Sequence, residues 1–135
     1  RFVGEIEGRD EKGIAIYKLS QLERNLQEDY AREEINAYAK GVLFGNAERL
    51  LPVETRGEFF TDKVLSGAQR SKIALVRTPD LFAAAKYVKD FSDSQYAKKC
   101  RIAIANAEGT IVDFEVPRRP TDASQIDVRP KSKRG

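Results

Sequence analysis

Residues 72–80 read KIALVRTPD, a short apolar strand that runs straight into the start of a helix. Residues 72–77 predict the strand. Thr78 is a cap residue, Pro79 lacks the N–H that a first helical turn leaves unbonded, and Asp80 suits the positive end of the helix dipole. A strand followed at once by a helix is the repeating unit of α/β folds, in which helices pack on a sheet.

The same alternation continues along the rest of the chain. Apolar runs and alternating patterns predict further strands at residues 2–7, 39–44 and 110–116. Helical spacing predicts helices at residues 17–34, 61–69, 78–89 and 93–107, with Thr61 and Ser92 as caps. This order predicts an α/β fold with a mostly parallel or mixed sheet of about four strands and helices packed on it.

The length of 135 residues suits one domain, and 41% hydrophobic with 33% charged residues is typical of a folded chain. Residues 1–116 are predicted to form the α/β domain. Residues 117–135, with three prolines and no aromatic residue, are predicted to form a flexible basic tail. Because the pattern begins inside a strand, we expect the full domain to have N-terminal strands that this sequence lacks.

The net charge of +3 belongs to the tail, where six cations and two anions leave the preceding residues slightly acidic. A charge run of this kind is usually solvated. The alternative interpretation is a sequence-independent affinity for phosphates, which salt would weaken. The basic character therefore says little about the folded domain.

Several function classes are excluded or disfavoured by what the sequence lacks. A single cysteine, Cys100, and no histidine rule out an internal disulfide, a zinc site and a histidine-based triad. The glycine spacings of phosphate-binding and dinucleotide-binding loops are absent. No leader and no apolar run of about 20 residues occur, so we expect a cytoplasmic protein without a membrane segment.

One pair of residues has the pattern of a site. Glu5 and Glu7 lie two apart on the first predicted strand, so both point to one face, while Phe2, Gly4 and Ile6 point to the other. Two such carboxylates can share a hard divalent cation such as Mg²⁺. The alternative interpretation is a solvent-facing strand with ordinary charges.

The following helix carries two stripes. Leu19, Leu22 and Leu26 are spaced to cover one side of a sheet. Lys18 and Gln21, together with Asn25, form a polar stripe beside them, near the end of the helix closest to the first strand. This stripe can complete a polar site with the two carboxylates, although the flank of a helix is commonly polar in any case.

Several short motifs, in their order along the chain, resemble the restriction-endonuclease-like superfamily. The resemblance covers residues 3–107. Within the superfamily, the chain is most similar to the C-terminal part of the core in a poorly characterised bacterial branch. The motifs are Glu5-Ile6-Glu7-Gly8, Gln21-Leu22 on a helix, Lys40-Gly41-Val42-Leu43-Phe44-Gly45-Asn46, then Arg49, Pro52, Arg56, Phe60-Thr61 and Thr78-Pro79-Asp80-Leu81-Phe82.

In that superfamily, an acid on one strand and an acid-x-lysine on the next hold Mg²⁺ and a water that attacks a phosphodiester. The resemblance implies that Glu5 is a metal ligand and that Glu7, standing where the lysine usually stands, is a second ligand or a base. It implies that Lys18 supplies the displaced cation and that Gln21 orients the acid or the water. The first acid would belong to a preceding strand, so the active site in this chain is expected to be incomplete.

Arg49 and Arg56 flank Pro52 in the predicted loop and can grip phosphates through forked hydrogen bonds, unless they are merely exposed. The leading hypothesis is a nuclease-related domain that binds Mg²⁺ and a nucleic-acid backbone, and hydrolyses phosphodiesters only when the missing strands are supplied. The alternative is a non-catalytic module that joins other domains of a larger bacterial protein, other partners or a second copy through an open strand edge.

Overall fold

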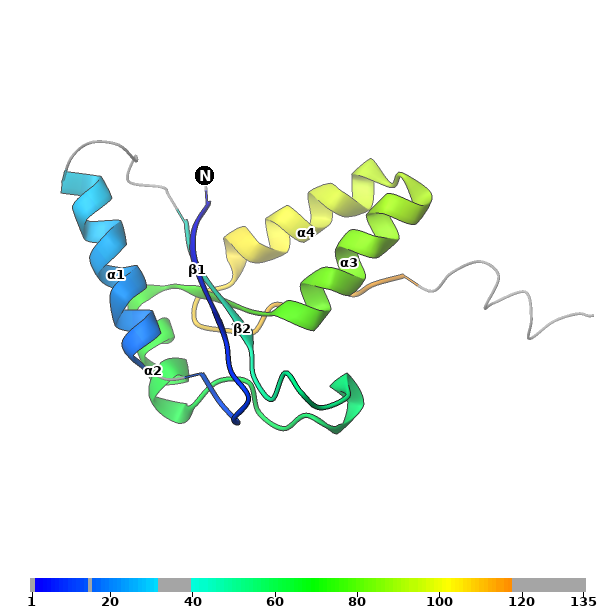
Figure 1. Cartoon of the computed structure of the whole chain (residues 1–135). Helices are drawn as coiled ribbons and strands as arrows, with labels where there is room; N and C mark the ends of the chain where they lie inside the picture. The colour runs from blue at the N-terminus through cyan, green and yellow to red at the C-terminus, as the bar shows by residue number, and fades with distance from the viewer. Residues whose placement is uncertain (1, 15, 32–39, 118–135) are drawn as a thin grey trace, which may run out of the picture.

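The computed structural model describes residues 2–14, 16–31 and 40–117 (Figure 1). These residues form three strands: β1 (Phe2–Gly8), β2 (Lys40–Asn46) and β3 (Ala74–Arg77). They also form the helices α1 (Ile16–Ala31), α2 (Asp62–Ser71), α3 (Thr78–Phe91) and α4 (Ser94–Asn106), and the 3-10 turn η1 (Val53–Thr55). The predicted α/β alternation is confirmed, and residues 118–135 of the predicted tail lie outside the described residues.

The sheet is parallel, in the order β1-β2-β3. β2 lies in the centre, and its residues Gly41, Val42 and Leu43 are buried, as the continuous apolar run predicts. Helices α1 and α2 cover one face of the sheet, and α3 and α4 cover the other (Figure 1).

The predicted fourth strand at residues 110–116 is wrong. Ile111 forms only an isolated parallel bridge with Leu75, through hydrogen bonds from Leu75 N–H to the Thr110 oxygen and from Val112 N–H to the Leu75 oxygen. Beyond this bridge the Phe114 side chain is buried in the core under α3 and α4, and Glu115 has a positive φ of 47°. The backbone therefore leaves the sheet before a strand can form.

Two hydrophobic cores lie on the two faces of the sheet. The first contains Leu19 and Leu22 of α1, both fully buried, against Leu43 and Leu75 of the sheet. The second is built around Val42, Ala74 and Val76 of the sheet, with the following helical and C-terminal residues packed on them: Ala84, Tyr96, Ile104, Ala107, Val112 and Phe114. The predicted apolar stripe of α1 is thus confirmed as part of the core.

The helix starts were predicted in part. Thr61 caps α2, since its Oγ1 accepts the Val64 N–H, as expected. Ser92 does not cap α4: it ends α3 with a positive φ of 50°, and Asp93 accepts the Tyr96 N–H at 2.9 Å instead. Thr78 is already helical, because the chain turns from β3 into α3 at Arg77. None of the described helices has both the length and the apolar character that crossing a bilayer requires.

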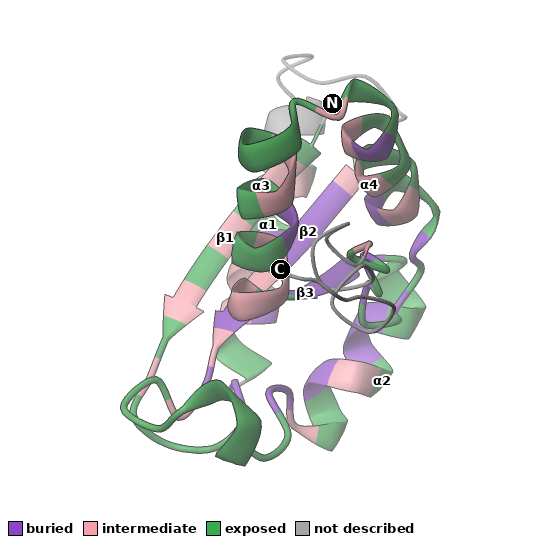
Figure 2. Ribbon diagram, turned by 90° about the vertical axis from the view of Figure 1, so that its right-hand side faces the viewer, coloured by how far each residue is buried: buried purple, intermediate pink, exposed green. Residues whose placement is uncertain are grey.

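The two faces of β1 differ in burial. Val3, Glu5 and Glu7 are half-buried on the side that α1 covers, while Phe2 and Ile6 are 42% and 62% exposed on the opposite side. Figure 2 shows this alternation along β1 at the outer edge of the sheet. Helix α3 packs mainly on β2 and β3, and α4 packs on β3, so the second helical layer covers β1 less than the other two strands. The predicted separation of the two carboxylates from Phe2 and Ile6 is confirmed.

The carboxyl end of β2 offers a test of this packing. A Cβ on Gly45 would lie 2.8 Å from Ile14 Cγ1 and 3.0 Å from Phe60 Cε1, so Gly45→Ala should lower the free energy of unfolding by about 1–3 kcal/mol. A Cβ on Gly8, at the end of β1, would make only ordinary contacts, with the flexible Arg49 side chain at 3.5 Å and with Asn46 Cβ at 3.9 Å. Gly8→Ala should therefore change the free energy of unfolding by no more than about 0.5 kcal/mol in urea titrations followed by circular dichroism. Equal losses in the two variants would contradict the described packing.

Candidate functional site

The polar site lies between β1 and α1 and is centred on Glu5. Asn25 Nδ2 donates a hydrogen bond to Glu5 Oε2 at 2.8 Å, and Lys18 Nζ lies 3.7 Å from Glu5 Oε1. Lys18 Nζ also donates to Gln21 Oε1 at 3.1 Å. The side chains of Lys18 and Glu5 are only 19% and 21% exposed. The structure thus brings together Glu5, Lys18, Gln21 and Asn25, as the spacing predicted.

Burial of Leu19 and Leu22 places these polar groups. Both leucines insert into the core under the sheet, which fixes the rotation of α1 about its axis. Residues three and four apart lie on one side of a helix, so Lys18, Gln21 and Asn25 then line the flank that faces β1. The site is therefore a direct consequence of how α1 packs.

Glu7 lies on the same face as Glu5 but has a different partner. Its Oε1 accepts a short hydrogen bond from the hydroxyl of Tyr17, which is 61% exposed. This hydrogen bond, and then the negative charge of Glu7, raise the pKa of the Tyr17 phenol above its ordinary value. Sequence reasoning missed Tyr17, and its only signal is its position one residue before Lys18.

The donor set suits a weakly held, water-rich cation. Glu5 and Glu7 can supply carboxylate oxygens, which are ligands that Mg²⁺ prefers, usually with several retained waters. Within residues 2–14, 16–31 and 40–117, no three His, Cys, Asp or Glu side chains lie together as a metal-holding group. The residues present therefore fit a cation held through one or two carboxylates, and do not form an all-protein cage.

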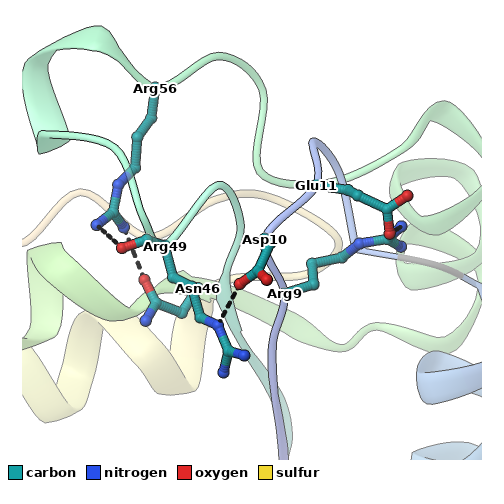
Figure 3. A network of polar contacts seen from close by, with 6 residues as sticks. All are labelled: Arg9, Asp10, Glu11, Asn46, Arg49 and Arg56. Atoms are coloured by element: carbon teal, nitrogen blue, oxygen red, sulfur yellow. Dashed lines mark hydrogen bonds and ion pairs between the residues drawn. The ribbon is translucent and has the colours of Figure 1, made fainter.

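A second group of polar side chains gathers where β1 and β2 end (Figure 3). Arg56 uses all three of its guanidinium nitrogens: Nε donates to the Leu51 oxygen at 3.0 Å, Nη1 to Asn46 Oδ1 at 2.7 Å, and Nη2 to the Arg49 oxygen at 3.3 Å. All three acceptors belong to residues 46–51, so the Arg56 side chain bridges this turn and stabilises it. The prediction that Arg56 binds nucleic acid is untested, and this geometry favours a supporting role for it.

Of the two predicted arginines, Arg49 is the better placed to contact a phosphate. Its Nε donates to Asp10 Oδ1 at 2.7 Å, and its side chain is 52% exposed. Figure 3 shows the Nη groups of Arg49 extending away from Asp10. Arg9, which sequence reasoning did not single out, lies beside this group, with Nη2 bonded to Glu11 at 2.8 Å and a buried Nε without a hydrogen-bond partner among the described atoms.

No family model, no curated protein and no solved structure significantly matches this chain. The interpretation of the site therefore depends on its own geometry and on the sequence motifs.

The contact between Glu7 and Tyr17 predicts a measurable titration. Because the Glu7 carboxylate accepts a hydrogen bond from the phenol and repels the phenolate, the Tyr17 pKa should lie above its ordinary value in the native protein. Glu7→Gln should lower it towards that value, since the charge is lost, whereas Glu28→Gln on the exposed surface of α1 should leave it unchanged. Carbon-13 NMR of ring-labelled tyrosine resolves the titration, and an identical Tyr17 pKa in all three proteins would contradict the contact.

Proposed function

We propose that this chain is a nuclease-related domain that binds a divalent cation and a nucleic-acid backbone. The observation that carries the proposal is the half-buried Glu5 with Lys18 at 3.7 Å and Gln21 bonded to that lysine. An acid with an ammonium and a carboxamide beside it is what the resemblance to the restriction-endonuclease-like superfamily implies for a metal ligand, a charge stabiliser and an orienting residue.

The hydrogen bonds around Glu5 leave one of its oxygens less firmly held than the other. Oε2 accepts the Asn25 amide at 2.8 Å, which fixes the orientation of the carboxylate. Oε1 has only the longer 3.7 Å contact with Lys18, whose ammonium is already bonded to Gln21. Oε1 is therefore the oxygen that we assign to the cation, with Glu7 as the second ligand or a base.

Mg²⁺ bound there would polarise a non-bridging phosphate oxygen and lower the pKa of the attacking water. Lys18 would hold its charge beside the scissile phosphate, and Gln21 would position Lys18 through their hydrogen bond. The resemblance assigns a further acid to a strand before Glu5, so we propose that hydrolysis occurs only when that strand is supplied. Arg49 would contact the backbone beyond the carboxyl end of β1, where its side chain lies near Gly8 and Asp10, while Arg56 would hold the turn at residues 46–51.

A second candidate function is a non-catalytic interaction module. The observation that favours it is the uncovered apolar side of β1, where Phe2 and Ile6 are exposed. Salt-sensitive retention on heparin and binding of labelled DNA would support the first function. Their absence in a chain that forms a stable dimer would support the second.

Cation binding tests the assignment of Glu5. Titration of Mn²⁺ followed by electron paramagnetic resonance should show a weak site, and Glu5→Gln should weaken it by about tenfold or more, because even outer partners of a metal ligand contribute on this scale. Glu28→Gln, which removes an exposed carboxylate from α1, is the control and should bind as the native protein does.

Equal Mn²⁺ binding by the native protein and Glu5→Gln would refute the metal assignment. In a longer version that includes a preceding strand, Mg²⁺-dependent plasmid cleavage that survives Glu5→Ala would refute the catalytic one.

Backbone binding is tested at Arg49, with the tail cations Arg129, Lys131, Lys133 and Arg134 changed to glutamine in every protein compared. Arg49→Ala should weaken binding to DNA of any sequence and reduce the slope of log affinity against log salt by about one. Arg101→Ala, which removes an exposed cation from α4, should leave the slope unchanged. If both variants shift the slope equally in fluorescence anisotropy titrations, Arg49 has no specific part in binding.

A further inference from the structure

The outer edge of β1 has no strand beside it in the described part of the chain, where β1 pairs only with β2. One hydrogen bond shows which amide groups of β1 point towards β2 and which point outwards. The Arg9 N–H donates to the Asn46 oxygen at 3.1 Å, so the odd-numbered residues of β1 direct their amide groups towards β2. Because amide directions alternate along a strand, those of Phe2, Gly4 and Ile6 point outwards, where a further strand could bind them.

An apolar surface adjoins this edge. A hollow of about 340 Å³ is lined by Gly4, Glu5, Ile6, Phe44 and Leu81, on the side of the sheet that carries α3. Phe2 and Ile6, 42% and 62% exposed, extend it along the strand. Unpaired amide groups beside exposed apolar side chains are a template for pairing with another strand.

We propose that β1 of a second copy of this chain pairs antiparallel with this edge, with the two Gly4 residues opposite each other. Phe2 of one copy then lies opposite Ile6 of the other, twice, and the outward amide groups of all three positions become hydrogen-bonded pairs. The two three-stranded sheets join into one, and the two apolar surfaces become continuous on the same face.

Charge favours this register over the two registers that are centred further along the strand. A register centred on Glu5 would place the two Glu5 carboxylates directly opposite each other. A register centred on Ile6 would place Glu5 opposite Glu7 twice. Like charges opposite each other destabilise a sheet. Centring on Gly4 instead places Glu5 opposite Val3, and uses the same outward amide groups.

The pairing specifies the partner of the second candidate function and rests on it, but it is separate from the cation site of the first. Glu5, Lys18 and Asn25 lie on the α1 side of the sheet, and the apolar surface lies on the α3 side. A dimer can therefore form whether or not the polar site binds a cation.

The oligomeric state of the full chain tests the proposal, with charges introduced at the exposed positions 2 and 6. In sedimentation equilibrium the native chain should be a dimer. The double variant Phe2→Lys/Ile6→Lys places like charges opposite each other and should raise the dimer dissociation constant by about tenfold or more. Phe2→Glu/Ile6→Lys replaces the same two side chains but places opposite charges together, so most of the affinity should return at low salt.

Ile102→Lys, which changes an exposed apolar residue of α4, is the matched control and should leave the dimer intact. A native chain that is monomeric at every concentration would overturn the proposal. So would a dimer that responds equally to the two double variants, or one that Ile102→Lys weakens as much as Phe2→Lys/Ile6→Lys does. Circular dichroism verifies that each variant is folded, and the charge-paired variant excludes a simple loss of strand structure as the cause.

Discussion

The insertion of Leu19 and Leu22 of α1 into the core under the sheet is the contact on which the rest of the molecule depends. It sets the rotation of α1, which brings Lys18 and Asn25 against β1. With the helix turned by one residue, about 100°, the polar stripe would face water and Glu5 would be half-buried without a partner. An ionised carboxylate in that position is costly unless it is hydrogen-bonded and paired. The apolar packing of α1 and the polar contacts of Glu5 thus depend on the same rotation of the helix.

The polarity of β1 is the reverse of that of an ordinary half-buried strand. Its carboxylates face the covering helix, while Phe2 and Ile6 face outwards. This reversal has two separate consequences. Towards α1 it gathers charged groups in a partly desolvated place, where their interactions are stronger than in water. On the other side it leaves an apolar strip that only the edge of α3 borders, at Leu81, since α3 and α4 pack mainly on β2 and β3.

Periodicity was enough to predict the elements and the cluster at Glu5, because side-chain direction in a strand or helix follows from spacing alone. It failed where tertiary context decides the outcome. Residues 110–116 have a strand-like pattern, yet burial of Phe114 draws the chain away after one bridge. Arg56 resembles an exposed loop cation in sequence, but its guanidinium is used by three acceptors that only the folded turn brings together. Tyr17 reaches Glu7 through a side-chain conformation that spacing does not specify.

The ion pair at Glu5 is longer than the ion pair at Asp10. Arg49 Nε lies 2.7 Å from Asp10 Oδ1, whereas Lys18 Nζ lies 3.7 Å from Glu5 Oε1. The side chains of Lys18 and Glu5 are nevertheless more buried than those of Arg49 and Asp10. Because attraction falls with distance, Lys18 holds Glu5 Oε1 less firmly than a close ion pair would. The longer separation, with Lys18 held by Gln21, leaves Glu5 Oε1 able to accept another cation without displacing the lysine from its hydrogen bond. That difference, more than the number of carboxylates, is the reason for proposing a cation at Glu5.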